Sequence, residues 1–230
     1  MEKIKHEQFI LAVEKKAFDD IDGYVDMDPE ELRTRVTGAL IVARRHELET
    51  DERFLQFIPY VVLYRMVDNE AQVYTYRRAA GSGEDRLLGL GSIGVGGHIE
   101  VKDIPFKNSS MVDFNKTVAN AIERELEEEV YFEDGEGVRI SDFHVVRTLF
   151  GVIQDKSNEV GRVHVGLVYA VKVPSYVTVL SKESDMQNVG MLDLDGLLKV
   201  GNRYGFELEN WSERLLSLVP DLTLLGRILK

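Results

Sequence analysis

Five of the seven residues at positions 123–129 are glutamates, and one of the other two is Arg124. Such a run is most simply the solvated face of a helix, but its spacing argues against this for three of the acids. At about 100° per residue, Glu125, Glu128 and Glu129 continue the stripe that the preceding turns use for apolar residues. We therefore expect these three carboxylates to point inward.

Carboxylates gathered near the end of one helix need a compensating cation. Glu125 and Glu129 form an i,i+4 pair of like charge, which costs a few tenths of a kcal/mol when exposed and more when buried. The helix macrodipole also disfavours anions near the C-terminus. The arrangement suits a hard divalent ion such as Mg²⁺, which binds a few carboxylate oxygens and leaves positions for water and phosphate. Glu123 and Glu127 face the other way and are expected to be solvated.

The elements that position these acids follow from the hydrophobic pattern. Residues 114–130 have a helical pattern, and the segment 79–100 before them holds seven glycines, as expected where backbone segments approach closely. Further predicted helices are 28–36, 192–200 and 207–219, and the predicted strands are 8–13, 55–65 (with Pro59 at an edge or bulge), 72–78, 138–153 and 162–173. Strands and helices alternate without regular βαβ spacing, so we predict an α/β (α+β) fold with a mixed sheet.

Composition excludes several classes of function. The 28 basic and 40 acidic residues give a net charge of −12, which opposes binding to a nucleic acid polymer. The sequence has no cysteine, so disulfides, thiolate zinc sites and cysteine nucleophiles are excluded. Because no apolar run reaches about 18 residues and the start MEKIKHEQ lacks the core of a signal peptide, we expect a cytoplasmic protein without membrane contacts.

The acidic run and the glycines before it resemble the Nudix box, the signature of the MutT-like Nudix hydrolases. Residues 124–130 fit its REUxEE core, and residues 96–100 look like the GG-x-I-E that opens it. Through the segments 58–65 and 86–100 the chain looks most similar to the MutT-type predicted phosphoesterases. The resemblance implies a Nudix-like α/β/α sandwich with a mixed β-sheet. It would form one globular unit with an N-terminal extension at 1–54, a catalytic core at 55–200 and a C-terminal helix at 201–230.

The resemblance also implies a reaction, in which water attacks phosphorus in the diphosphate linkage of a small, phosphorylated, nucleotide-like substrate. The implied cofactor is Mg²⁺ or Mn²⁺, held by the carbonyl of Gly97 and the carboxylates of Glu125, Glu128 and Glu129. Arg124 would orient the carboxylates, and Glu128 or Glu125 would be the base. Glu183, in the later segment SKESD, is a further candidate for the base. Candidates for substrate contacts are Arg78, Arg86 and His98.

The sequence departs from the box at three places. Lys116 stands eight residues before the arginine, where the family pattern has a glutamate, and Tyr131 replaces the glycine expected after the helix. From Gly97 to Arg124 is 27 positions, about twice the spacing of the usual box. The residue that braces Arg124 is therefore open, and Asp113 is a candidate.

Two alternative functions follow from these departures. The chain could be a catalytically weak or inactive Nudix-fold protein that binds a nucleotide or metabolite as a regulator. It could also be an interaction protein in which the acidic helix is purely structural. A homodimer stays open. Residues 89–94 match GxGxxG, but the sequence after them is typical of a strand rather than a helix, which argues against a dinucleotide site.

Overall fold

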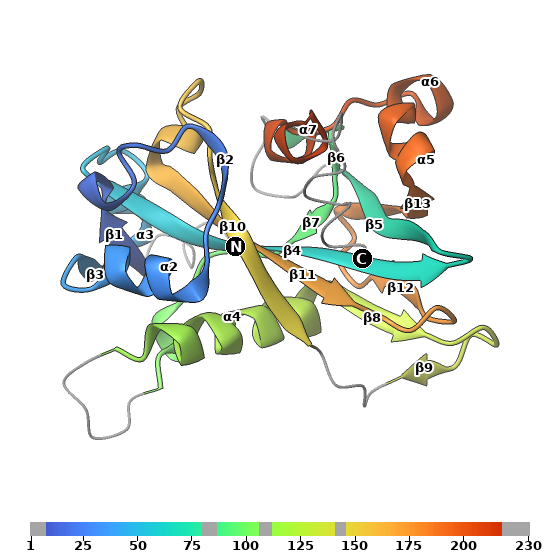
Figure 1. Cartoon of the computed structure of the whole chain (residues 1–230), viewed down its shortest axis with the longest axis horizontal. Helices are drawn as coiled ribbons and strands as arrows, with labels where there is room; N and C mark the ends of the chain where they lie inside the picture. Colours follow the sequence, from blue (N-terminus) through green and yellow to red (C-terminus); the bar gives the residue numbers. More distant parts are fainter. Residues whose placement is uncertain (1–7, 80–86, 106–111, 141–145, 218–230) are drawn as a thin grey trace. The chain divides into compact units, whose positions relative to one another are not determined.

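The computed structural model describes residues 8–79, 87–105, 112–140 and 146–217, whose helices and strands are labelled in Figure 1. The chain divides into two compact units, each assembled from separate segments. Unit 1 comprises Met1–Tyr60, Gly96–Arg124 and Leu149–Val168, and unit 2 comprises Val61–Val95, Glu125–Thr148 and Tyr169–Lys230. Within the described ranges, no helix is long and apolar enough to cross a membrane.

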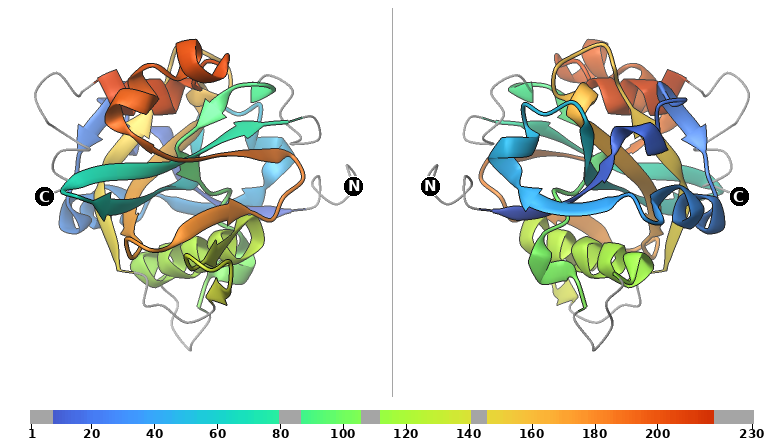
Figure 2. Two further views of the ribbon diagram at one scale, coloured as in Figure 1. Left: turned by 90° about the vertical axis from the view of Figure 1, so that its right-hand side faces the viewer. Right: turned by 90° about the vertical axis from the view of Figure 1, so that its left-hand side faces the viewer.

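Unit 1 is built on antiparallel strand pairs. Strand β1 (Phe9–Glu14) pairs with β3 (Leu40–Arg44) and with the start of β4 (Phe54–Val67), where Ala12 lies opposite Gln56. Strand β2 (Gly23–Asp26) pairs with β10 (Arg147–Gln154). The N-terminal elements, drawn in blue, face the viewer in the right panel of Figure 2. The unit also contains η1 (Lys15–Ala17), α3 (Arg45–Leu48), η3 (Val101–Asp103) and η4 (Gly161–Val163).

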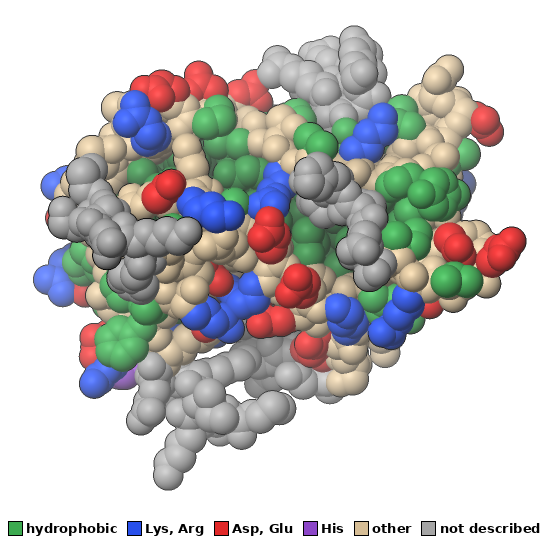
Figure 3. Space-filling model, turned by 90° about the horizontal axis from the view of Figure 1, so that it is seen from below, with side chains coloured by type: hydrophobic (Ala, Val, Ile, Leu, Met, Phe, Trp, Pro, Cys, Tyr) green, Lys and Arg blue, Asp and Glu red, His purple; other side chains and the backbone are tan. Residues whose placement is uncertain are grey.

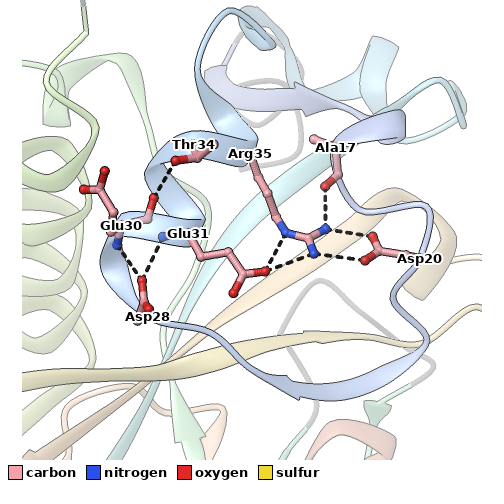
Figure 4. Close-up of polar contacts among 7 residues, drawn as sticks. All are labelled: Ala17, Asp20, Asp28, Glu30, Glu31, Thr34 and Arg35. Carbon is pink, nitrogen blue, oxygen red and sulfur yellow. Dashed lines mark hydrogen bonds and ion pairs between the residues drawn. The ribbon is translucent and has the colours of Figure 1, made fainter.

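Helix α2 (Pro29–Val36) confirms the helix predicted at 28–36. Its N-cap is Asp28, whose Oδ1 accepts hydrogen bonds from the backbone N–H groups of Glu30 and Glu31 at 2.9 and 2.8 Å (Figure 4). Proline at the first helical position is compatible with this start, because its missing N–H would have had no partner in the helix. The sequence signals of cap and proline thus set where the helix begins.

Arg35 connects this helix to the loop after η1. Its guanidinium donates two hydrogen bonds to the carboxylate of Asp20, at 2.7 and 2.9 Å, and a third to the carbonyl of Ala17 at 3.2 Å. Two further hydrogen bonds, from Nε and Nη2, join it to Glu31 (Figure 4). The hydrogen bonds from Arg35 lower the pKa of the Asp20 carboxyl. A planar guanidinium is suited to such a bidentate contact.

Unit 2 contains the predicted hairpin. Strand β4 turns into β5 (Glu70–Arg78) through Asp68 and Asn69, both with positive φ, 49° and 65°, as a two-residue hairpin turn of type I′ requires. Strand β13 (Met186–Asp193) pairs with the other edge of β5. The short strands β6 (Gly91–Ser92) and β7 (Gly94–Val95) pair with β5 and β4. A separate sheet has the order β12 (Thr178–Ser181), β8 (Val130–Glu133), β9 (Arg139–Ile140).

Several predicted boundaries were wrong. The single strand predicted at 138–153 is two strands, β9 and β10, with residues 141–145 outside the described ranges. The helix predicted at 192–200 is divided into α5 (Leu194–Leu198) and α6 (Val200–Tyr204), and its first two residues end β13. The last helix, α7, is described for Asn210–Ser217. The strand predicted at 162–173 is β11 (His164–Lys172).

Pro59 lies inside β4, where a missing backbone N–H would interrupt a ladder. It falls between two paired stretches of the strand. Residues 54–56 pair with β1, and Val61 and Val62 pair with β7. Gly96 passes over this gap so closely that a Cβ added to it would lie 1.8 Å from the Pro59 carbonyl oxygen. Its φ of +149° is also one that side chains disfavour.

The substitution Gly96→Ala is therefore expected to destabilise the protein by about 2 kcal/mol or more, because the new methyl group meets backbone and φ is strained. Gly135→Ala is the matched control, since a Cβ there would meet nothing within 4 Å. We expect its effect to stay within about 0.5 kcal/mol. Urea unfolding of both variants measures the difference, and similar midpoints would contradict the close approach.

Candidate active site

Helix α4 (Phe114–Glu129) carries the acidic run. At its start, the Asp113 carboxylate accepts a hydrogen bond from the backbone N–H of Lys116 at 3.0 Å, and its carbonyl accepts one from Thr117 at 2.9 Å. Phe114 packs against Phe57 of β4, with ring centroids 5.2 Å apart. Asp113 is thus the N-cap of the helix, and the prediction that it braces Arg124 was wrong.

The exposure of the glutamates follows the helical period in part. Glu125 is buried, with 6% of its surface exposed. Glu129 is partly buried, and Glu123 and Glu127 are exposed as predicted. Glu128 is also exposed. Of the three carboxylates expected to point inward, Glu125 is therefore buried and Glu129 is partly buried, and the expectation was wrong for Glu128. A burial cost is thus concentrated on Glu125.

Arg124 is anchored by Asp103 rather than by Asp113. Its Nε donates to Asp103 Oδ1 at 2.9 Å and its Nη2 donates to Oδ2 at 2.8 Å, a bidentate pair with a carboxylate that is only 3% exposed. Nη2 also donates to the carbonyl of His98 at 2.8 Å. The arginine therefore joins α4 to the glycine segment that opens the predicted box.

A sequence signal for Asp103 existed. The family pattern has an acid eight residues before the arginine, and in this sequence that position is Lys116, an exposed residue. Counted forward from the glycine that opens the box, the position of this acid is six residues after Gly97, which is Asp103. The acidic partner of Arg124 thus precedes the inserted residues. Lys116 therefore does not occupy the position of the acid in the family pattern.

The glycine segment is held from two sides in unit 1. The Leu11 N–H of β1 donates to the carbonyl of Ile99 at 2.8 Å, and the Ile99 N–H donates to Phe57 of β4 at 3.4 Å. Glu100 caps η3, and its carboxylate lies 3.5 Å from the Arg124 guanidinium. Gly97 is the predicted carbonyl ligand. These hydrogen bonds to strands β1 and β4 fix the backbone close to it.

The C-terminal end of α4 meets the segment between β12 and β13. The Lys182 N–H donates to the carbonyl of Glu129 at 2.8 Å, and its ammonium group contacts the carbonyl of Glu127. A cation here interacts favourably with the helix dipole. The next residue is Glu183, the further candidate for the base. It is exposed, and its backbone N–H donates a hydrogen bond to Ser181 Oγ at 3.0 Å.

Tyr131 needs no glycine conformation, because α4 runs directly into β8. Tyr131 pairs with Leu180 of β12, and the guanidinium of Arg139 lies 4.3 Å from the centre of its ring. The described residues other than glycine with positive φ are Asp68 and Asn69. The departure from the family pattern at this position therefore reflects a different helix ending.

In unit 2, two buried tyrosines lie near the acidic end of α4, and Arg78 lies against one of them. Tyr74 and Tyr76 are fully buried, as expected for core residues. Burial raises the pKa of both phenols, and the nearby negative charge of Glu129 raises these pKa values further. The Arg78 guanidinium lies 5.5 Å from the centre of the Tyr76 ring. Arg86 lies outside the described residues.

The side-chain types of the acidic run fit a magnesium ion, but their placement forms no complete site. Carboxylate oxygens are the ligands that Mg²⁺ prefers. Across the ranges that the structure describes, no group of three or more His, Asp or Glu side chains could hold a metal ion as placed. Figure 3 views the molecule from below, the side of α4 in Figure 1, where acidic and basic side chains are both at the surface.

One known protein is similar to the chain along most of its length. Protein YmaB of Bacillus subtilis (strain 168) is 33% identical over 189 residues, which make up 82% of this chain and 82% of YmaB. No protein-family model matches the sequence.

Solved structures show the fold. Tm1382, a protein classed by inference as a Nudix hydrolase, aligns with a TM-score of 0.65 at 23% identity over 94% of this chain and 99% of its own. A Nudix hydrolase from Alicyclobacillus acidocaldarius reaches 0.48 at 12% identity, over 71% of this chain and 90% of its own. The Nudix domain of Shewanella oneidensis NrtR, solved with ADP ribose, reaches 0.43 at 15%, over 71% and 84%. The last two scores are too low to support an argument. The match to Tm1382 confirms the predicted Nudix-like α/β/α sandwich with a mixed β-sheet.

Proposed function

Because the chain belongs to the family of protein YmaB and has the Nudix fold, we propose that it is a hydrolase of the Nudix kind that depends on a divalent metal. Its reaction is the cleavage of a diphosphate linkage, by water attack at phosphorus, in a small nucleotide-like substrate. A net charge of −12 favours such a ligand only if a cation neutralises its phosphates. The proposed ion is Mg²⁺ or Mn²⁺.

The observation that carries the proposal is the buried carboxylate of Glu125 beside an anchored arginine. Carboxylate oxygens are the ligands that Mg²⁺ prefers, and a carboxylate held in place by burial is preorganised for such an ion. Glu125, Glu128 and Glu129, with the carbonyl of Gly97, are the proposed ligands. When bound, the ion would offset the charge of the diphosphate and lower the pKa of the attacking water.

Arg124 and Glu128 of α4 have different proposed roles. Arg124 touches no substrate in this proposal, and it positions the helix by its hydrogen bonds to Asp103 and the His98 carbonyl. We assign the base to Glu128, because its carboxylate is exposed and can receive a proton from water that reaches the helix. Arg78, Arg86 and His98 stay proposed contacts to the substrate.

The proposal is tested by measuring phosphate or nucleotide release from a panel of nucleotide sugars, dinucleotides and canonical and oxidised nucleoside triphosphates. We expect turnover of at least one class with Mg²⁺ or Mn²⁺ present, and its loss on adding EDTA. Turnover that is the same with and without the chelator would contradict metal dependence. No product from any class, with metal present, would contradict the hydrolase.

The alternative is a Nudix-fold protein that binds a nucleotide or metabolite without cleaving it. It is favoured by the exposed Glu128 and by the lack of a preformed group of metal ligands among the described residues. Calorimetry showing tight binding of a ligand that stays intact over hours with Mg²⁺ would support this function. A cytoplasmic location and a homodimer stay predictions.

A further inference from the structure

Two histidines and a glutamine meet inside unit 1. His98 belongs to the glycine segment, His164 begins β11, and Gln56 lies on β4. The Nε2 atoms of His98 and His164 are 3.1 Å apart, and Gln56 Oε1 is 2.9 Å from His98 Nε2. His164 is 7% exposed and Gln56 is fully buried.

A hydrogen bond to a backbone carbonyl determines which ring nitrogen of His164 carries the hydrogen and which has a free lone pair. His164 Nδ1 lies 2.7 Å from the carbonyl of Val160. A carbonyl only accepts, so Nδ1 carries the hydrogen, and in the neutral ring the lone pair is on Nε2. Metal-binding histidines commonly have this arrangement, with the second ring nitrogen donating to a backbone carbonyl.

The cluster also contains a buried polar atom that needs explanation. Gln56 Nε2 is buried and has no hydrogen-bond partner among the described residues. Buried donors in folded proteins are nearly always satisfied, and an exception often marks a binding site for an ion or a water. A hydrogen on His98 Nε2, donated to Gln56 Oε1 or to His164 Nε2, accounts for both distances but gives Gln56 Nε2 no acceptor. A metal ion bound to His98 would replace this hydrogen. A hydrated ion would provide one through a bound water.

We propose that His98 and His164 bind a divalent transition-metal ion of the Zn²⁺ type through their Nε2 atoms, with Gln56 Oε1 as a third ligand. Two nitrogens 3.1 Å apart fit such an ion. At a bond length of about 2.0–2.1 Å they subtend about 100°, close to a tetrahedral angle. Water completes the coordination from the side of His98, which is partly exposed.

The ligand types separate this site from the proposed magnesium site. Imidazole nitrogens suit Zn²⁺, Co²⁺ and Ni²⁺, whereas Mg²⁺ prefers carboxylate oxygen and water. Excess Mg²⁺ should therefore fill the carboxylate site without displacing a transition metal from the histidines. The Co²⁺ test needs no substrate, so the two proposals can fail independently. When its Nε2 binds the ion, His98 keeps only its other ring atoms for the substrate contact proposed above.

The test is a titration of the full-length protein with Co²⁺ in excess Mg²⁺, followed by visible absorption. We expect one bound equivalent that Zn²⁺ displaces. His98→Asn and His164→Asn should each weaken Co²⁺ binding at least tenfold. His46→Asn, which changes a partly exposed histidine of α3, and Glu127→Gln should leave it unchanged.

Nitrogen NMR of the wild-type imidazoles decides the matter even if the buried variant fails to fold. Zn²⁺ should shift the Nε2 signals of both histidines while His164 Nδ1 stays protonated. The proposal is overturned if wild-type protein takes up no Co²⁺ in excess Mg²⁺. It is equally overturned if Zn²⁺ leaves both Nε2 signals unmoved, or if folded variants of both histidines retain full affinity.

Discussion

Glu128→Gln is expected to lower kcat for the proposed hydrolysis by about 100-fold or more, because it removes both a proposed metal ligand and the proposed base. The exposed position makes this substitution informative. Glutamine keeps the shape of the side chain, and a surface change of this kind alters stability by no more than about 0.5 kcal/mol. A loss of activity then reports on chemistry rather than folding. Steady-state kinetics at saturating Mg²⁺ measure the effect.

The matched control is Glu127→Gln, one residue earlier on the same helix and also exposed. It removes the same charge from the solvated face, so we expect kcat to change by less than about twofold. Mn²⁺ affinity, followed by electron paramagnetic resonance, gives a second readout that needs no substrate. Equal activities of the two variants would remove Glu128 from the mechanism.

Asp103→Ala is expected to destabilise the protein by about 3–5 kcal/mol, because it leaves the largely buried guanidinium of Arg124 without its bidentate partner. Asp103 is 3% exposed and its contacts to Arg124 are 2.8 and 2.9 Å. Urea denaturation at neutral pH measures the loss.

Asp113→Ala is the comparison variant, since it removes an exposed N-cap from the same helix. Loss of a cap costs about 0.5–2 kcal/mol, so the two midpoints should differ clearly. If Asp113→Ala proved as damaging as Asp103→Ala, the assignment of the arginine's partner would be wrong.

Local patterns in the sequence predicted helices α2 and α4 and the hairpin well. Asp28 followed by proline set the start of α2, and the two turn residues Asp68 and Asn69 joined β4 and β5. The 3.6-residue period placed Glu125 inward and Glu127 outward. These features depend on residues a few positions apart, where helix and turn geometry is fixed by the backbone itself.

Strands without an apolar pattern were missed. The sequence MQNVGMLD of β13 has polar residues and a glycine, and its pairing with β5 shifts register between Asn188 and Gly190. Strand β2, GYVD, is short and mostly exposed. Such strands are held by a partner that is distant in the sequence, so their own residues carry little signal.

The polar contacts of the site were the hardest to predict. His98 and His164 are 66 residues apart, and no spacing rule connects them. Asp103 and Arg124 are 21 positions apart in the sequence. Contacts of this kind arise only once the strands are paired, because tertiary structure rather than local sequence brings them together.

The position of Asp103 has a practical consequence for engineering. The Asp103–Arg124 ion pair, which seats α4, has its partners on either side of positions 105–112, so residues added there lengthen the segment that the pair closes without altering either partner. The entropy of closing a loop grows slowly, at about 0.6 kcal/mol for each doubling of length. An epitope or a fluorescent reporter inserted between Asp103 and α4 is therefore expected to leave the ion pair formed and the acidic helix in register.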